Sequence, residues 1–312
     1  IDSTEVTQAT TAAMSERSDD EQCGKYMLLD RLFKFIKTED DEPINSVLAG
    51  YFSKVIQLLV NRKQKQIVPY IIADENKVVE NLLRHVYSRS VAEVIHRLLH
   101  IVDSNFEDEI SSKIAEKKQF ILSSLIEQLA SEREDETVMN AAFILQDILE
   151  QKSFFQVLTK RHNMQKMYEI AFKEDQVDSE SCFVTQGLIA RFVQQFNDRQ
   201  KQTQKDDRWD CSGDDDDDII VNEISDDEEN EDSKNNHASA VVELLVKMID
   251  PLIAILETSS TDPLKSSYRE IKIFPLGRTK LRAIELLQAI ISLKKANIIN
   301  AVGKSKAMTK VL

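Results

Sequence analysis

The sequence predicts an all-α protein, built as a helical-repeat solenoid of the HEAT or armadillo kind. Three observations support this fold class. The 312 residues include only six glycines and five prolines, so few residues break helices. Apolar residues recur at steps of three and four, which places them on one side of a helix. About fifteen such segments follow one another with short polar loops between them, as in stacked helical repeats, and no repeat period is regular enough to define the unit.

The first clear helix is expected at residues 26–37, followed by an acidic loop at 39–42. The chain begins with Ile1 rather than methionine and ends at Leu312 inside an apolar pattern. We therefore expect a fragment of a longer protein, truncated at its C-terminus.

A long amphipathic helix is expected from Pro43 to Lys63. Pro43 suits the first turn, and Arg62 with Lys63 places positive charge at the end where carbonyl groups are unpaired. Gly50 costs about 1 kcal/mol relative to alanine inside a helix, and the close approach of a neighbouring helix would explain it. The apolar residues form one continuous stripe: Ile44, Val47, Leu48, Tyr51, Phe52, Val55, Ile56 and Leu59.

Further helices follow at short intervals, each with its own apolar stripe. They are expected at 65–73, 75–87, 90–103, two within 106–131, one from Asp135 or Thr137, 163–173 and 178–199.

The helical pattern stops from Gln200 to Asn236, where we predict a disordered acidic insert. Between Asp206 and Asp232 there are 15 acidic residues and one basic residue. This local charge of −14 equals the net charge of the whole chain, because the remainder has 39 residues of each sign. The acidity is therefore a property of one segment and not of the folded body.

Helix resumes at Val241, and Asp250-Pro251 is expected to kink or split it. A loop at 258–274 leads to Pro275, which opens a long helix through Leu293. The predicted organisation is a helical-repeat part at 1–199, the insert at 200–236, and the continuation of the helical-repeat domain at 237–312.

Composition and motifs argue against several classes of protein. No apolar run reaches the roughly 18 residues that a membrane span needs, and no secretion signal is evident. The cysteines Cys23, Cys182 and Cys211 are far apart and lack CxxC spacing, which fits a cytoplasmic or nuclear setting without disulfides. His96 and His100 share a helical face, but no third ligand is evident, so no metal site is expected. No nucleotide-binding loop or nucleophile motif occurs, and we expect neither an enzyme nor a cofactor.

Two segments resemble the signatures of the SAPS-domain family, the regulatory subunits of protein phosphatase 6 and its yeast counterpart. The first is Leu48-Ala-Gly-Tyr-Phe-Ser-Lys54 with Arg62-Lys63, and the second is Pro275-Leu-Gly-Arg-Thr-Lys-Leu281. Leu32-Phe-Lys-Phe35 and the segment from Leu82 to Leu99 also follow the family order. The tryptophan usual upstream of Glu116-Lys-Lys118 is missing, so the chain resembles a divergent member.

The resemblance implies a non-catalytic regulatory and scaffold subunit that binds a phosphatase 6-type catalytic subunit. Further scaffold subunits with ankyrin repeats would be additional partners. It also supports the solenoid geometry, which the pattern alone does not establish. The hydrolytic chemistry and its metals would then belong to the partner.

The basic residues of the two signatures allow two interpretations: a solvated face at a helix end, or contact with an acidic partner surface. Tyr51 and Phe52 are expected in the core, with an interface as the alternative. The residues that would contact the partner are Tyr51, Lys54, Arg62, Lys63, Arg97, Arg278 and Lys280.

The insert holds three further candidate sites. Ser212 and Ser225 lie before acidic residues, a context typical of phosphorylation by casein-kinase-2-like enzymes. Ile219, Ile220 and Val221, with acid on both sides, resemble a SUMO-interacting segment that would add a strand to a partner sheet.

The alternative function is a generic helical-repeat adaptor that binds basic proteins through the acidic insert. Such binding would weaken steeply with salt, whereas a packed phosphatase interface would survive. The basic clusters are too short and too mixed with acid to indicate nucleic-acid binding.

Overall fold

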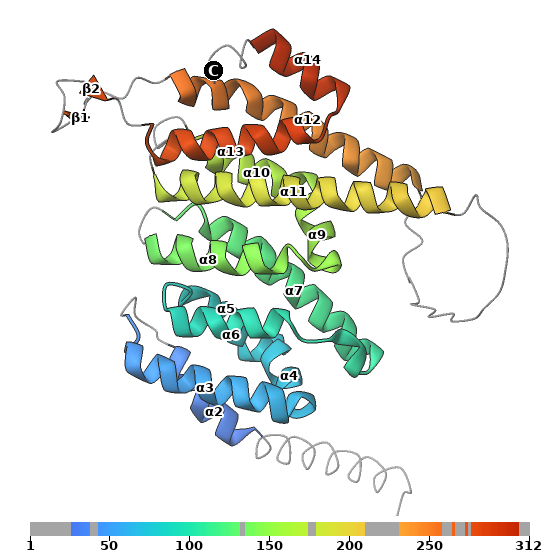
Figure 1. Ribbon diagram of the computed structural model, residues 1–312. Coiled ribbons are helices and arrows are strands. Elements are labelled where there is room, and N and C mark those ends of the chain that lie inside the picture. Colours follow the sequence, from blue (N-terminus) through green and yellow to red (C-terminus); the bar gives the residue numbers. More distant parts are fainter. Residues whose placement is uncertain are drawn as a thin grey trace, which may run out of the picture. The chain divides into compact units, whose positions relative to one another are not determined.

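The computed structural model describes residues 26–37, 43–131, 135–173, 179–209, 231–257, 264–265, 272–273 and 276–305 (Figure 1). These residues form thirteen α-helices, which confirms the predicted all-α class. The chain divides into two compact units, residues 1–121 and 122–312, and the boundary falls within one helix. Within the described ranges, every helix is too short or too polar to span a lipid bilayer.

The first unit contains five helices and the start of a sixth, close to the predicted ranges. They are α2 (Met27–Phe33), α3 (Ser46–Arg62), α4 (Gln64–Ile72), α5 (Val78–Arg84), α6 (Arg89–Leu99) and α7 (Asp108–Gln128). Short 3₁₀ turns lie at Lys34–Ile36, Asp74–Asn76 and Asp103–Asn105.

Helix α3 begins at a side-chain cap and packs against α4 and α6. The Asn45 Oδ1 atom accepts hydrogen bonds from the backbone N–H groups of Val47 (3.0 Å) and Leu48 (3.1 Å), which would otherwise be unpaired. Phe52 is buried, and its ring centroid lies 5.7 Å from that of Phe33 and 5.4 Å from that of Phe35. This aromatic cluster joins the α2 region to α3.

A chain of hydrogen bonds centred on His85 joins three parts of the first unit. His85 Nε2 lies 3.1 Å from the Ile36 carbonyl, and since a carbonyl can only accept, Nε2 carries the proton. In the neutral ring Nδ1 then accepts from the Tyr87 hydroxyl at 3.2 Å. That hydroxyl in turn accepts from the Ile44 N–H at 2.9 Å. The buried His85 therefore ties the entry to α3 to the turn after α5.

Lys117 attaches α7 to the rest of the first unit. Its Nζ atom lies 2.6 Å from Asp74 Oδ1 and 3.1 Å from Glu80 Oε1. Burial disfavours the charge on Lys117, but the hydrogen bonds to the two carboxylates outweigh it and raise the pKa of the lysine. The same contact lowers the pKa of Asp74.

The second unit is built around one long helix, α11 (Glu180–Trp209). Figure 1 shows α8, α11 and α13 side by side, and α11 packs against both of the others and against α10. Among the remaining helices, α12 packs against α13, α14 and α10, and α9 packs against α10. Their bounds are α8 (Asp135–Ile148), α9 (Lys152–Thr159), α10 (Arg161–Ala171), α12 (Glu231–Glu257), α13 (Arg278–Ser292) and α14 (Ala296–Ser305).

Several features of the chain beyond residue 105 differ from the predicted elements. The range 106–131 holds one helix, α7, because the polar residues that interrupt its stripe are themselves good helix formers. Helices α9 and α14 were not predicted. Helix α12 is not split at Pro251, because the proline removes one backbone hydrogen bond without ending the helix, and the predicted kink stays a prediction. A two-residue antiparallel pair, β1 (Leu264–Lys265) and β2 (Lys272–Ile273), lies within the expected loop.

Helices extend into both ends of the range predicted for the acidic insert. Helix α11 runs to Trp209 and α12 begins at Glu231, so both reach into the range 200–236. Lysine, glutamine and arginine favour helix, which allows a helix to extend beyond its apolar stripe. Residues 210–230 lie outside the described residues. The predicted division at 200–236 stays a prediction, and α11 and α12 belong to the same compact unit.

Candidate partner-binding surface

Helix α3 is apolar on two sides, and only one of them is buried. Its core side consists of Ala49, Phe52, Ser53, Ile56 and Val60. Large apolar side chains on another side are exposed by 42 to 63%: Val47, Leu48, Tyr51, Val55 and Leu58. Because these five positions recur at steps of three and four, they form one continuous strip along the helix. We call this strip the α3 surface.

The predicted core position of Tyr51 is wrong. Phe52 is 4% exposed, whereas Tyr51 is 63% exposed. The apolar stripe predicted for α3 lies between its buried side and its exposed side. Some residues of the stripe are therefore in the core and others are exposed to solvent. The sequence could not distinguish them because the apolar arc of α3 is wider than the face that its neighbours cover. The structure thus places Tyr51 where a partner could contact it.

Basic side chains border the α3 surface. Lys54, Arg62, Lys63 and Lys65 are exposed, and none of them forms an ion pair with a described residue. No aspartate or glutamate occurs from Pro43 to Ala73. The four basic residues of this stretch therefore have no acidic neighbour within it. Three of the predicted contact residues, Lys54, Arg62 and Lys63, therefore lie at one apolar and cationic surface with Tyr51.

Arg97 lies on α6, beside α3, and hydrogen-bonds Asn61 through its guanidinium group. It is exposed and contributes a further cation next to the α3 surface. Gly50 also faces α6, but a Cβ atom there would lie 3.9 Å from Ser90 Oγ, an ordinary van der Waals contact. The expectation that close helix approach requires this glycine is therefore wrong.

The second signature lies in the second unit and makes contacts within the chain. Gly277 has φ 77° and ψ 157°, a conformation that glycine adopts far more readily than other residues, and it precedes α13. Arg278 Nη1 lies 2.8 Å from Glu180 Oε2, and the guanidinium lies 5.0 Å from the centroid of the Phe183 ring. Arg282 lies over the same ring at 4.5 Å. These contacts fasten α13 to α11.

The partner-contact role predicted for Arg278 and Lys280 stays a prediction. Arg278 keeps a half-exposed side chain, yet its charge is already paired with Glu180. Lys280 is partly buried. The structure places both in the second unit and the other five predicted contact residues in the first.

An open groove of about 630 Å³ lies across α8, α11 and α13 in the second unit. Its lining includes the small residues Gly187, Ala190 and Ala289. It also includes one glutamine from each helix: Gln146, Gln194 and Gln288. This lining is polar, whereas small-molecule sites are mostly apolar.

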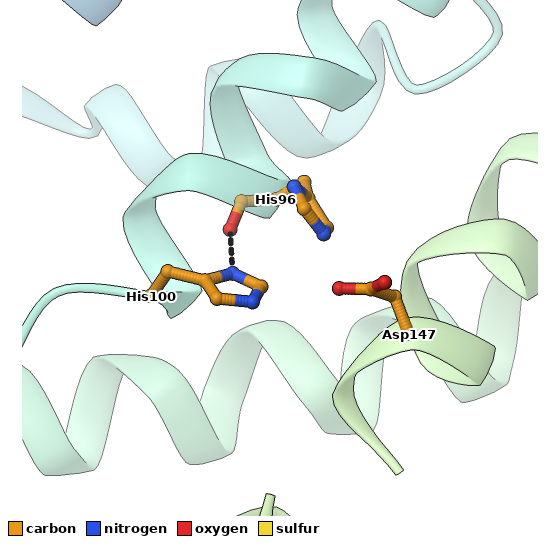
Figure 2. Close-up of side chains that lie close together, drawn as sticks. All are labelled: His96, His100 and Asp147. Atoms are coloured by element: carbon orange, nitrogen blue, oxygen red, sulfur yellow. Dashed lines mark hydrogen bonds between the residues drawn. The ribbon is translucent and has the colours of Figure 1, made fainter. Parts of the chain in front are cut away.

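His96, in the last turn of α6, and His100, the C-cap residue of that helix, lie together, as their spacing predicts (Figure 2). Their ring centroids are 4.4 Å apart, and His100 Nδ1 donates to the His96 carbonyl at 2.9 Å. Asp147, also drawn in Figure 2, belongs to α8 in the second unit. Among the described residues of the first unit, no third His, Cys, Asp or Glu completes a ligand set. The expectation that no metal binds at these histidines stays a prediction.

The candidate sites of the insert lie outside the described residues. These are the predicted phosphorylation sites Ser212 and Ser225 and the predicted SUMO-interacting residues Ile219, Ile220 and Val221.

A model of the SAPS family, described as SIT4 phosphatase-associated protein, matches residues 56–310 of the chain. The match begins at Ile56, within α3, and covers both compact units. It includes the second signature, whereas Leu48 to Lys54 of the first signature lie just before it.

Curated relatives give a consistent picture. Serine/threonine-protein phosphatase 6 regulatory subunit 1 of Mus musculus is 33% identical over 123 residues, which are 39% of this chain and 14% of the relative. Regulatory subunit 3-A of Xenopus laevis is 28% identical over 123 residues, again 39% of this chain and 14% of the relative. Regulatory subunit 2 of Mus musculus is 28% identical, over 39% of this chain and 13% of the relative. The aligned segment thus spans about one seventh of the length of these relatives.

Proposed function

Because the chain belongs to the family of SIT4 phosphatase-associated proteins, we propose that it is a non-catalytic regulatory and scaffold subunit of a phosphatase 6-type Ser/Thr phosphatase. The observation that carries this proposal is the family match over residues 56–310, which covers most of the chain. The names of the relatives, all phosphatase 6 regulatory subunits, support it.

In this role the stacked helices present a surface that holds the catalytic subunit and brings substrates or further scaffold subunits close to it. Holding two proteins together raises their effective concentration, so the rate increases without new chemistry in this chain. Ankyrin-repeat scaffold subunits are the further partners that the sequence resemblance implies. A cytoplasmic or nuclear location would suit these partners.

Affinity purification from the protein's own cells tests the proposal. The tagged chain is compared with a variant that lacks residues 210–230, a deletion that removes no residue of α11 or α12. We expect mass spectrometry to find a phosphatase 6-type catalytic subunit with both proteins. Absence of any phosphatase catalytic subunit from both samples would contradict the proposal.

The concentration of acidic residues in the insert favours one second candidate, an adaptor for basic proteins. The same purification distinguishes this adaptor from a phosphatase regulatory subunit. Basic proteins that are lost on deletion of residues 210–230, and that leave the wild-type chain as salt rises, would support the adaptor function.

A further inference from the structure

We propose that the α3 surface is the docking site for the phosphatase catalytic subunit, and that it fits an apolar patch bordered by acidic side chains on that partner. This inference rests on the proposed function and adds the place and chemistry of the contact. It places the contact on α3 rather than on the basic residues of the second signature.

The first support is the amount of apolar side chain that α3 leaves exposed. Surface helices usually carry one apolar stripe towards the core and polar residues elsewhere. Here Tyr51 lies near the middle of a second strip, with Val47 and Val55 one turn away on either side and Leu58 beyond. Interfaces concentrate their binding energy in a few central apolar and aromatic side chains, with tyrosine among the most frequent. The α3 surface has the same composition, with a central tyrosine among aliphatic side chains.

The second support is charge. Lys54 and Arg62 border the strip, Lys63 and Lys65 follow it, and no acidic residue lies between Pro43 and Ala73. The four cations have no ion-pair partner among the described residues. Complementary charge around an apolar centre orients a partner and speeds its association. The partner surface should therefore carry aspartate or glutamate around its apolar patch.

The same charges argue against two other occupants. A second copy of the chain, docked α3 to α3, would bring four cations against four, which costs free energy because like charges repel. A lipid surface would need the helix to sink into the headgroup region. Helix α3 cannot do so freely, since Phe52, Ile56 and Val60 hold it in the core of the first unit.

Calorimetry with purified catalytic subunit tests the inference. The variants are Tyr51→Asp, Leu58→Asp and the double charge reversal Lys54→Glu with Arg62→Glu. The matched control is Ile299→Asp, which alters a side chain of α14 that is 54% exposed, the same fraction as Leu58. Circular dichroism melts should agree among all the proteins, because substitutions of exposed residues change stability little.

We expect Tyr51→Asp and Leu58→Asp to weaken binding more than about tenfold, as central interface residues do, and Ile299→Asp to bind like the wild type. The affinity of the wild type should fall with salt, and the charge-reversal variant should lose most of that dependence.

The other outcomes each overturn the inference in a recognisable way. If the wild type and all variants bind equally, the α3 surface is not the contact, and the proposed function stands. If the wild type does not bind, the proposed function and the inference fail together. A wild-type dimer that Tyr51→Asp converts to a monomer in light scattering, with unchanged phosphatase binding, would assign the surface to a second copy. Loss of binding to phosphatidylserine vesicles alone would assign it to a membrane.

Discussion

At the scale of single residues, the backbone conformation at Gly277 explains why the second signature has a glycine at this position. Its φ of 77° and ψ of 157° lie in a region essentially restricted to glycine, and this turn sets the start of α13. We predict that Gly277→Ala lowers the free energy of unfolding by about 1 to 3 kcal/mol. Chemical denaturation measures it, and Gly303→Ala, at a helical glycine with no heavy atom near its Cβ position, is the control. Equal stability of Gly277→Ala and wild type would show that the turn tolerates alanine.

Gly50 should behave in the opposite way. It is helical, and a Cβ atom would meet only Ser90 Oγ at 3.9 Å. We predict that Gly50→Ala raises the free energy of unfolding by about 0.5 to 1 kcal/mol, because alanine loses less backbone entropy on folding. Thermal unfolding checks this. A lower melting temperature would mean that α6 lies too close to α3 for a methyl group.

His85 should make stability depend on pH. Burial lowers its pKa below 6.5, the hydrogen bond to Ile36 offsets part of this effect, and the charge of Arg84 adds to it. The unfolded chain takes up the proton at about 6.5, before the folded chain does. The contribution of neutral His85 is therefore complete above pH 6.5 and is lost as the pH falls below it.

We predict that the stability difference between wild type and His85→Gln is larger at pH 7.5 than at pH 5.5. Urea unfolding at both values measures the difference, and comparing the two proteins removes the contribution of the other titrating groups. An identical difference at the two pH values would show that His85 titrates alike in the folded and unfolded chains.

At the scale of elements, α3 carries both the core and the proposed contact surface. Phe52 packs against Phe33 and Phe35, so Phe52→Ala should lower the free energy of unfolding by about 3 to 5 kcal/mol. Tyr51→Ala, one residue earlier and mostly exposed, should change it by less than about 0.5 kcal/mol. Denaturant titrations of both variants check the assignment, and similar losses for the two would contradict it.

The helices themselves could be predicted because their apolar spacing is local information. The stripe of α6 follows from residues within one or two turns. The predicted start of α3 at Pro43 is three residues too early, because the helix begins at Ser46 after the Asn45 cap. The side of α3 that is buried could not be predicted, because it depends on where α4 and α6 pack. The stacking of Arg278 and Arg282 on Phe183 could not be predicted either, since it requires the pairing of α11 with α13, about 95 residues apart. Candidate contact residues could thus be named from the sequence, but not assigned to surface or core.

At the scale of the molecule, charge is separated along the chain. The stretch from Asp206 to Asp232 carries a net charge of −14, while the stretch from Pro43 to Ala73 carries four basic residues and no acidic one. The first unit holds the cationic α3 surface, and the second holds the acidic segment between α11 and α12. In the proposed function, salt should weaken binding at the α3 surface only in part, because that contact is largely apolar. Salt should weaken binding through the acidic segment more strongly, because that contact depends on charge.

The central claim is that this chain binds a phosphatase 6-type catalytic subunit and supplies none of the chemistry. Size-exclusion chromatography of the purified chain with the purified catalytic subunit, with p-nitrophenyl phosphate hydrolysis measured in every fraction, tests it most directly. We predict a one-to-one complex that carries phosphatase activity and no activity in the fractions of the chain alone. Separate elution of the two proteins, or hydrolysis by the chain alone, would contradict the account.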